Sequence, residues 1–144
     1  MPNNHNFDVL LVEDDPADAG LTRAALDQAR ILCNLHHVSD GVEALAFLRK
    51  QGAFDAAPTP HLVLLDLNMP RMGGREVLAE MRADTGLHQI PVVVLTTSDV
   101  DSDVQASYNL GANSFITKPV DIDQFIDAIK GLGDYWFSIV RLPR

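Results

Sequence analysis

The feature of this sequence that most constrains its fold is a set of short apolar runs in which apolar and polar residues do not alternate. Four such runs lie at positions 9–12, 62–65, 92–95 and 115–116, and a weaker one lies at 35–38. Runs of this length and kind are typical of strands that are buried on both faces of a parallel sheet. Parallel strands need a crossover segment between them, so we expect a helix after each run.

Helical patterns do separate the runs. Asp15 and Pro16 predict a cap and the first turn of one helix, and Asp40 and Glu43 form the capping-box pattern of a second. Further helices are expected at 75–82, from 98 to 111 and from 121. The expected inner faces are Leu21, Ala24, Ala25 and Gln28; Val42, Leu45 and Leu48; Val77, Leu78 and Met81; and Ile122, Phe125, Ile126 and Ile129. The predicted fold class is α/β, an open, doubly wound five-stranded parallel sheet with five helices.

Composition narrows the function classes. The 144 residues suit one compact domain, and the formal net charge of −9 disfavours a nucleic-acid partner because phosphate backbones repel an acidic protein. Cys33 is the single cysteine, which fits a reducing compartment. The N-terminus lacks the pattern of a secretory signal, and no apolar run is long enough to span a membrane, so a cytoplasmic protein is expected.

Polar side chains follow the strong runs at the points where the predicted strands end. Glu13 and Asp14 follow the first run, Asp66 follows the run at 62–65, Thr96 follows the next, and Lys118 follows the last. Ligands of open α/β sheets bind outside the carboxyl ends of the strands, where the strand order switches. We therefore expect acids, a hydroxyl and an amine to meet in one crevice.

Such a group of side chains suits phosphoryl transfer. Carboxylates that lie close together repel one another, and a hard divalent cation such as Mg²⁺ offsets the repulsion. A carboxylate beside the cation can attack phosphorus and form an aspartyl phosphate. Asp66 has the chemistry of that nucleophile, while Lys118 and Thr96 could hold the phosphoryl oxygens.

In these segments the chain resembles the receiver domains of two-component response regulators. The matching pieces are Val-Glu-Asp-Asp-Pro at 12–16, Leu-Asp-Leu-Asn-Met-Pro at 65–70, Gly-Gly at 73–74, Thr-Thr-Ser at 96–98, Leu-Gly-Ala at 110–112 and Lys-Pro at 118–119. The resemblance extends from about residue 8 to residue 129. It implies a flavodoxin-like (βα)5 receiver fold over residues 1–130 that accepts phosphate from a sensor histidine kinase.

The resemblance also implies a metal site. Asp66 would be the phosphoacceptor, Asp14 a direct Mg²⁺ ligand, and Glu13 an acid that acts through water. Asn68 would give its backbone carbonyl to the metal, for which Mn²⁺ or Ca²⁺ could substitute.

The remaining implied roles concern phosphate binding and switching. Lys118 would bind the phosphate, Thr96 would be the switch hydroxyl, Phe115 the switch aromatic, and the bond from Lys118 to Pro119 a cis peptide. The chain departs from the family pattern in two places. Glu13 replaces a common Asp, and Phe115 stands where other members carry Tyr.

The segment 131–144 is an apolar C-terminal extension that a receiver core does not need. Its candidate contact residues are Leu132, Trp136, Phe137, Ile139 and Val140. The extension could fold back on its own domain, or it could form a homodimer contact. It resembles the tail of the single-domain regulators that serve bacterial phytochrome histidine kinases, and the loop at 53–60 and the run at 116–121 agree with that subgroup. A bacteriophytochrome is thus a candidate partner.

Two other functions compete with phosphoryl signalling. A pseudo-receiver would act without phosphorylation, but such proteins usually lack one of the acids or the lysine that are present here. A haloacid-dehalogenase-type phosphatase needs a second Asp two residues after the nucleophile, where this chain has Asn68. We therefore expect a signalling domain rather than an enzyme. His36 and His37 show no metal-ligand spacing and are expected to be structural or exposed.

Overall fold

The computed structural model describes residues 7–28, 33–67, 69, 72–96, 111–112, 114–118 and 122–130. Along these ranges the elements are β1 (Asp8–Val12), α1 (Pro16–Gln28), β2 (Asn34–Val38), α2 (Gly41–Leu48), the 3-10 helix η1 (Gly52–Phe54), β3 (Leu62–Asp66), α3 (Gly74–Ala83), β4 (Val92–Thr96), β5 (Ser114–Thr117) and α5 (Ile122–Lys130). The helix expected at 98–111 and the extension at 131–144 lie outside the described residues, apart from Gly111.

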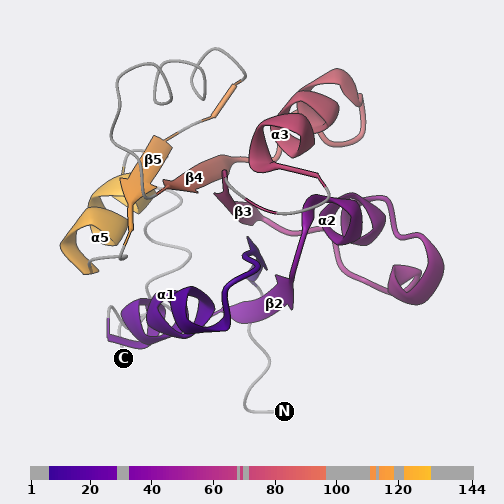
Figure 1. The fold of residues 1–144 in the computed structure, drawn as a ribbon. Helices are drawn as coiled ribbons and strands as arrows, with labels where there is room; N and C mark the ends of the chain where they lie inside the picture. The colour runs from indigo at the N-terminus through magenta and orange to yellow at the C-terminus, as the bar shows by residue number, and fades with distance from the viewer. Residues whose placement is uncertain are drawn as a thin grey trace.

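The five strands form one parallel sheet in the order β2-β1-β3-β4-β5 (Figure 1). This is the order of flavodoxin-like doubly wound sheets, with the switch point between β1 and β3. Helices α1 and α5 cover one face of the sheet, and α2 and α3 cover the other (Figure 1). The predicted α/β architecture is confirmed.

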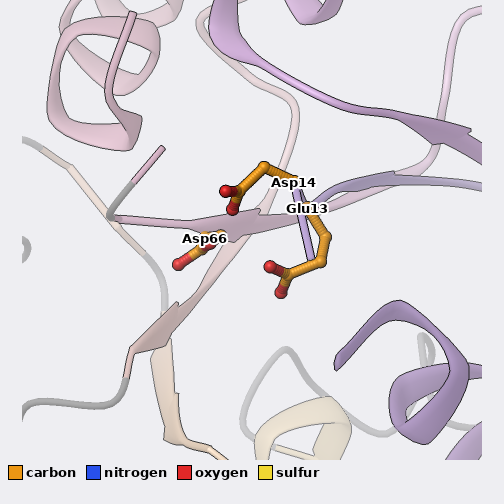
Figure 2. Close-up of side chains that lie close together, drawn as sticks. All are labelled: Glu13, Asp14 and Asp66. Carbon is orange, nitrogen blue, oxygen red and sulfur yellow. The ribbon is translucent and has the colours of Figure 1, made fainter. Parts of the chain in front are cut away.

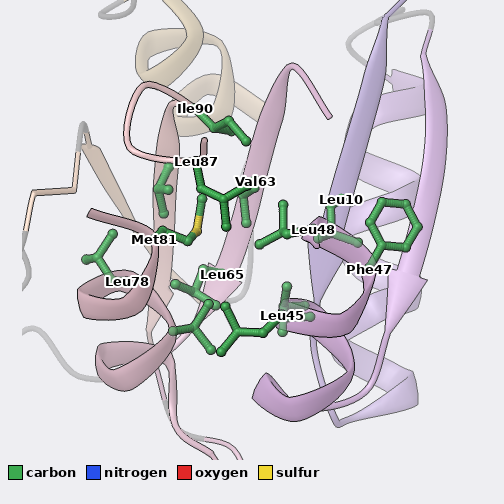
Figure 3. Packing of buried hydrophobic residues seen from close by; sticks show 14 of the residues in the cluster. Leu10, Leu45, Phe47, Leu48, Val63, Leu65, Leu78, Met81, Leu87 and Ile90 are labelled. Carbon is green, nitrogen blue, oxygen red and sulfur yellow. The ribbon is translucent and has the colours of Figure 1, made fainter. Parts of the chain in front are cut away.

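Burial on both faces explains the unbroken apolar runs. In β1, alternate residues Leu10 and Val12 pack with α2 and α3, while Val9 and Leu11 pack with α1 and α5. The strands β3 and β4 divide in the same way, and every residue of both strands is buried. Figure 3 shows the cluster between the sheet and α2 and α3. A one-sided sheet would have required polar residues at every second position.

The run at 35–38 is less apolar than the other four because β2 lies at the edge of the sheet. Both of its histidines make hydrogen bonds, and the His36 ring also packs against Phe47, with the ring centroids 5.4 Å apart. His36 donates from Nε2 to the Asp8 carboxylate over 3.0 Å, and His37 donates from Nε2 to the backbone carbonyl of Glu13 over 2.7 Å. The structural role expected for both side chains is confirmed.

The predicted inner face was partly wrong for α1, where Ala25 alone is buried as expected, and partly wrong for α2. The buried residues of α1 are Ala19, Thr22, Ala25 and Leu26, whereas Leu21, Ala24 and Gln28 are exposed. In α2, Leu45 and Leu48 are buried as expected, but Val42 is exposed and Ala44 and Phe47 take its place. Alanine and threonine tolerate either environment, so a short helix that contains them lets neighbouring elements decide which face is covered. The inner faces expected for α3 and for Phe125 in α5 are confirmed.

Both predicted aspartate caps are present, and one hydrogen bond of the predicted capping box differs. The Asp15 carboxylate accepts the backbone N–H of Ala17 over 2.8 Å and caps α1. The Asp40 carboxylate accepts the N–H of Glu43 over 2.8 Å at the start of α2. The Glu43 carboxylate, however, accepts the N–H of Ser39 rather than that of Asp40.

The loop at 53–60 is partly packed against the core. Residues Gly52–Phe54 form η1, and the side chains of Phe54 and Ala57 pack against the core cluster below α2 and α3. Lys50 donates from Nζ to the Ala57 carbonyl over 2.6 Å and helps to hold the loop. Among the described helices, none combines the length and the apolar character that crossing a membrane requires.

Two glycines allow chain segments to approach closely beside the end of β3. A Cβ at Gly74 would lie 2.3 Å from the Asp66 carbonyl oxygen, and one at Gly41 would lie 2.5 Å from the Met72 carbonyl oxygen. Gly74 also donates its N–H to the Leu67 carbonyl over 3.0 Å. Both contacts are with backbone atoms, which cannot move aside as a flexible side chain can. Gly74 thus lets the start of α3 lie directly against the end of β3.

We predict that Gly74→Ala lowers the free energy of unfolding by about 2 kcal/mol or more, because the added methyl group displaces the backbone at Asp66. The matched control is Gly20→Ala in α1, where a Cβ meets nothing within 4 Å. That change should raise stability by about 0.5 to 1 kcal/mol, since alanine favours the helix. Urea titrations of both variants measure the difference, and equal effects would contradict the steric account.

Candidate functional site

The candidate site lies at the carboxyl edge of the sheet, at the switch point between β1 and β3. Val12 pairs in register with Leu65, so the residues that follow β1 lie level with the end of β3. Glu13 and Asp14 come directly after β1, and Asp66 is the last residue of β3. Residues more than 50 positions apart in the sequence thus meet at one edge, as the strand-end pattern predicts.

Three carboxylates converge at this edge. Glu13, Asp14 and Asp66 each offer an oxygen, and the three oxygens lie within 4.8 Å of one another. Figure 2 shows the three side chains around a common space. Glu13 is fully buried and Asp66 is 2% exposed, whereas Asp14 lies at the surface. Buried carboxylates at this spacing need a counter-charge, since their charges repel in a medium of low dielectric.

Lys118 supplies part of that counter-charge. Its Nζ donates to Glu13 Oε1 over 2.9 Å and to Asp18 Oδ2 over 3.0 Å, and it lies 3.4 Å from Asp66 Oδ2. The lysine follows β5, and its backbone N–H donates to the Thr96 carbonyl over 2.7 Å. That bond ties the lysine to the end of β4. The predicted meeting of Lys118 with the acids is therefore present.

The surroundings of Lys118 favour its charged form. Burial opposes the charge, but the hydrogen bonds to Glu13 and Asp18 and the charge of Asp66 outweigh burial and raise the pKa of Lys118 above its ordinary value. The lysine side chain is 6% exposed, so solvent screens these contacts only weakly. The ammonium stays protonated at neutral pH and can act as a fixed cation.

The backbone holds Glu13 in position from several sides. Its N–H donates to the Val38 carbonyl over 3.0 Å, and its own carbonyl accepts from His37. Its second carboxylate oxygen accepts the N–H of Asp15 over 3.3 Å. Glu13, which stands where many family members have Asp, makes its hydrogen bond with Lys118 from this position.

Thr96 and Phe115 lie on the neighbouring strands β4 and β5. Thr96 ends β4 and is 1% exposed. Phe115 on β5 is half-buried and packs against the core cluster, and it also lines a cavity of about 270 Å³ with Ser114, Thr117, Gln124 and Asp127. Asn68 and Pro119 lie outside the described residues, so the expected metal carbonyl and cis peptide are not described.

Asp18 is the site residue that the sequence reading missed. It stands in the first turn of α1, and its carboxylate binds the ammonium of a lysine 100 residues away. The available signal was an acid within one helical turn of the acidic strand end. That signal was ambiguous, because acids are common in first turns for their interaction with the helix dipole.

The donor set fits a hard divalent cation. The three converging groups are all carboxylates, the ligands that Mg²⁺ prefers, and one of them is open to water. Lys118 pairs with three acids, Glu13, Asp18 and Asp66, and Asp14 adds a fourth negative charge, so a divalent cation would bring the edge closer to neutrality. No other group of three such ligands occurs within the described part of the chain.

The comparisons with known proteins agree with this geometry. Residues 9–130 match the family model described as the response regulator receiver domain. The chain is 44% identical over 135 residues to response regulator Rcp1 of Synechocystis sp., covering 94% of this chain and 92% of that protein. It resembles the solved Mn²⁺-bound form of Rcp1 with a TM-score of 0.77 at 43% identity, covering 96% and 99% of the two chains.

Two further solved structures are similar. The bacteriophytochrome response regulator RtBRR gives a TM-score of 0.83 at 44% identity, with 90% of this chain and 80% of that chain covered. The phosphorylated cyanobacterial phytochrome response regulator RcpA gives a TM-score of 0.79 at 42% identity, with 98% of this chain and 100% of that chain covered.

We predict that Mg²⁺ raises the free energy of unfolding, by about 2.7 kcal/mol at a free concentration of about one hundred times its Kd. Asp14→Asn should reduce this gain because it removes the exposed carboxylate of the cluster. The control is Asp15→Asn, which removes the same charge one position along and keeps a capping side chain. Thermal melts with and without Mg²⁺ measure the gain, and an equal gain in both variants would contradict the assignment.

Proposed function

The chain belongs to the response regulator receiver domain family, and from that membership we propose that Asp66 accepts a phosphoryl group from a histidine kinase in a Mg²⁺-dependent reaction. The observation that carries the proposal is the group of Glu13, Asp14 and Asp66 around a single space, with Lys118 beside it. Members of this family are signalling domains rather than classical enzymes, so the reaction modifies the protein itself.

In the proposed reaction an Asp66 carboxylate oxygen attacks the phosphorus of a phosphohistidine. The new bond joins that oxygen to phosphorus, and the bond from phosphorus to the imidazole nitrogen breaks, with its electron pair returning to the imidazole. Lys118 donates to the phosphoryl oxygens as charge develops on them, and its position 3.4 Å from Asp66 Oδ2 supports this role. Buried surroundings keep competing water away from the acid.

The metal ligands follow from the same cluster. Asp14 and Asp66 would hold Mg²⁺ directly, Glu13 would act through water, and the backbone carbonyl of Asn68 would complete the protein ligands. Mn²⁺ or Ca²⁺ could take the same place. When bound, the cation supplies charge neutralisation between the carboxylates and the incoming phosphate.

Thr96 and Phe115 form the proposed switch. A phosphoryl group on Asp66 offers the Thr96 hydroxyl a new acceptor and draws it toward the phosphate. The space that Thr96 leaves can then admit Phe115, which is half-buried and borders a cavity in the described structure. Phosphate would thereby shift the population between two packings of this face.

The partner we propose is a sensor histidine kinase of the bacteriophytochrome class. The support is the similarity to RtBRR and to RcpA, which are response regulators of bacteriophytochrome and phytochrome signalling. Such a partnership would place the protein in the cytoplasm, where the kinase domains of these sensors operate.

The residues Leu132, Trp136, Phe137, Ile139 and Val140 are proposed to form a homodimer contact. They lie outside the described residues, and the support is the apolar pattern of the segment 131–144.

We predict that the protein incubated with Mg²⁺ and a small phosphodonor gains one phosphoryl group, and that Asp66→Asn gains none because the amide is not a nucleophile. Asp15→Asn serves as the control and should be labelled like wild type. Intact mass measurement gives the result. Equal labelling of wild type and Asp66→Asn would end the proposal, and absence of labelling in both would favour a pseudo-receiver. Multiple turnover of a phosphomonoester would favour a phosphatase.

We predict faster phosphotransfer from a bacteriophytochrome kinase than from a histidine kinase of an unrelated sensor class. Electrostatic and shape complementarity set such preferences between related partners. Radiolabelled kinase and this protein, sampled over seconds, give the two rates. Equal rates from both kinases would argue against the phytochrome partnership.

We predict that removal of residues 131–144 converts a dimer into a monomer, because it deletes the apolar contact residues. Analytical ultracentrifugation of both forms measures the change in mass. An unchanged association state would show that the extension folds on its own domain instead.

A further inference from the structure

We propose that Asp18 is a positioning residue that holds the ammonium of Lys118 in place for the phosphoryl group on Asp66. The inference deepens the proposed function and rests on it. It assigns a role to a residue of α1 that lies outside the cluster of converging acids.

The first support is the geometry around Nζ of Lys118. An ammonium has three N–H groups. Two of them are used in short hydrogen bonds, to Glu13 over 2.9 Å and to Asp18 over 3.0 Å, while Asp66 is more distant at 3.4 Å. The third N–H is thus directed to the side of Asp66, where a phosphoryl oxygen would arrive.

The second support is the rigidity of Asp18 itself. Asp18 lies in the first turn of α1, and its backbone N–H donates to the capping carboxylate of Asp15 over 3.4 Å. Its side chain is 27% exposed, and that of Lys118 is 6% exposed. A helix anchored at its start can hold a long, flexible lysine side chain more precisely than a loop could.

The third support is the division of the acids between two cations. Glu13 and Asp66 both belong to the group whose oxygens lie within 4.8 Å of one another, and Asp18 does not. A divalent cation in that group competes with Lys118 for Glu13 and Asp66. Asp18 is then the partner that Lys118 keeps, and it prevents the ammonium from shifting when the cation binds.

Loss of Asp18 should therefore slow phosphorylation without weakening the binding of the phosphodonor. The effect acts on the reacting state, in which the ammonium must meet the phosphoryl oxygens, and less on the ground state. If Asp18 acted only through its charge, its removal should instead speed phosphorylation, because an anionic phosphodonor would bind more readily once a negative charge is lost. The two explanations can be separated by a variant that keeps the hydrogen-bond acceptor and loses the charge.

The experiment compares Asp18→Ala, Asp18→Asn and Asp27→Ala, the last being an exposed acid of the same helix away from the site. Phosphorylation by acetyl phosphate with saturating Mg²⁺ is followed over a range of donor concentrations. We expect Asp18→Ala to lower the maximal rate constant by about tenfold, the scale of one charge-assisted hydrogen bond, with little change in KM. Asp18→Asn should recover most of the rate, and Asp27→Ala should match wild type.

A wild-type rate in Asp18→Ala would overturn the inference, and so would equal changes in Asp18→Ala and Asp18→Asn, since only charge would then matter.

If wild type itself is not labelled, the proposed function fails, and a second measurement still tests Asp18. In protein labelled with ¹⁵N-lysine and saturated with Mg²⁺, which competes with Lys118 for Glu13 and Asp66, a hydrogen-bonded Lys118 ammonium should give an NMR signal that Asp27→Ala retains and Asp18→Ala loses. Retention of that signal in Asp18→Ala would overturn the inference by itself.

Discussion

The contact between Lys118 and the acids of the β1 and β3 ends is the interaction around which this site is built. Glu13 is fully buried and Asp66 nearly so, and burying two carboxylates so close together is costly unless a cation lies beside them. Lys118 reaches both, and it also donates to Asp18. The negative charge still exceeds the positive charge, and this excess makes the edge a receptor for a divalent cation.

The sheet supplies the precision that such a site needs. Parallel pairing of β1 with β3 brings Glu13 level with Asp66, and the Thr96 carbonyl fixes the backbone of Lys118. Gly74 lets the start of α3 pass against the Asp66 carbonyl at a distance that no side chain would allow. The acids are therefore held by backbone contacts whose geometry depends on the fold as a whole and not on the flexibility of the side chains.

The same arrangement explains how a local chemical event could reach the surface. Thr96 and Phe115 lie on adjacent strands, one beside the acids and the other beside a cavity between β5 and α5. Only β4 separates Asp66 on β3 from Phe115 on β5, and Phe115 borders a cavity into which its side chain could move. Close packing elsewhere in the sheet resists gradual deformation and favours a change between two discrete arrangements.

The sequence alone determined the strands and the principal acids. Residues buried on both faces must be apolar at every position, so the runs at 62–65 and 92–95 indicated central strands, and the polar residues after them indicated the site edge. It did not determine the inner face of α1, where Thr22 is buried and Leu21 is exposed, because small residues and threonine pack or face water almost equally well. Nor did it identify Asp18. The contact of Asp18 with Lys118 spans 100 residues and depends on the direction in which α1 leaves the sheet, and only the tertiary packing of α1 sets that direction.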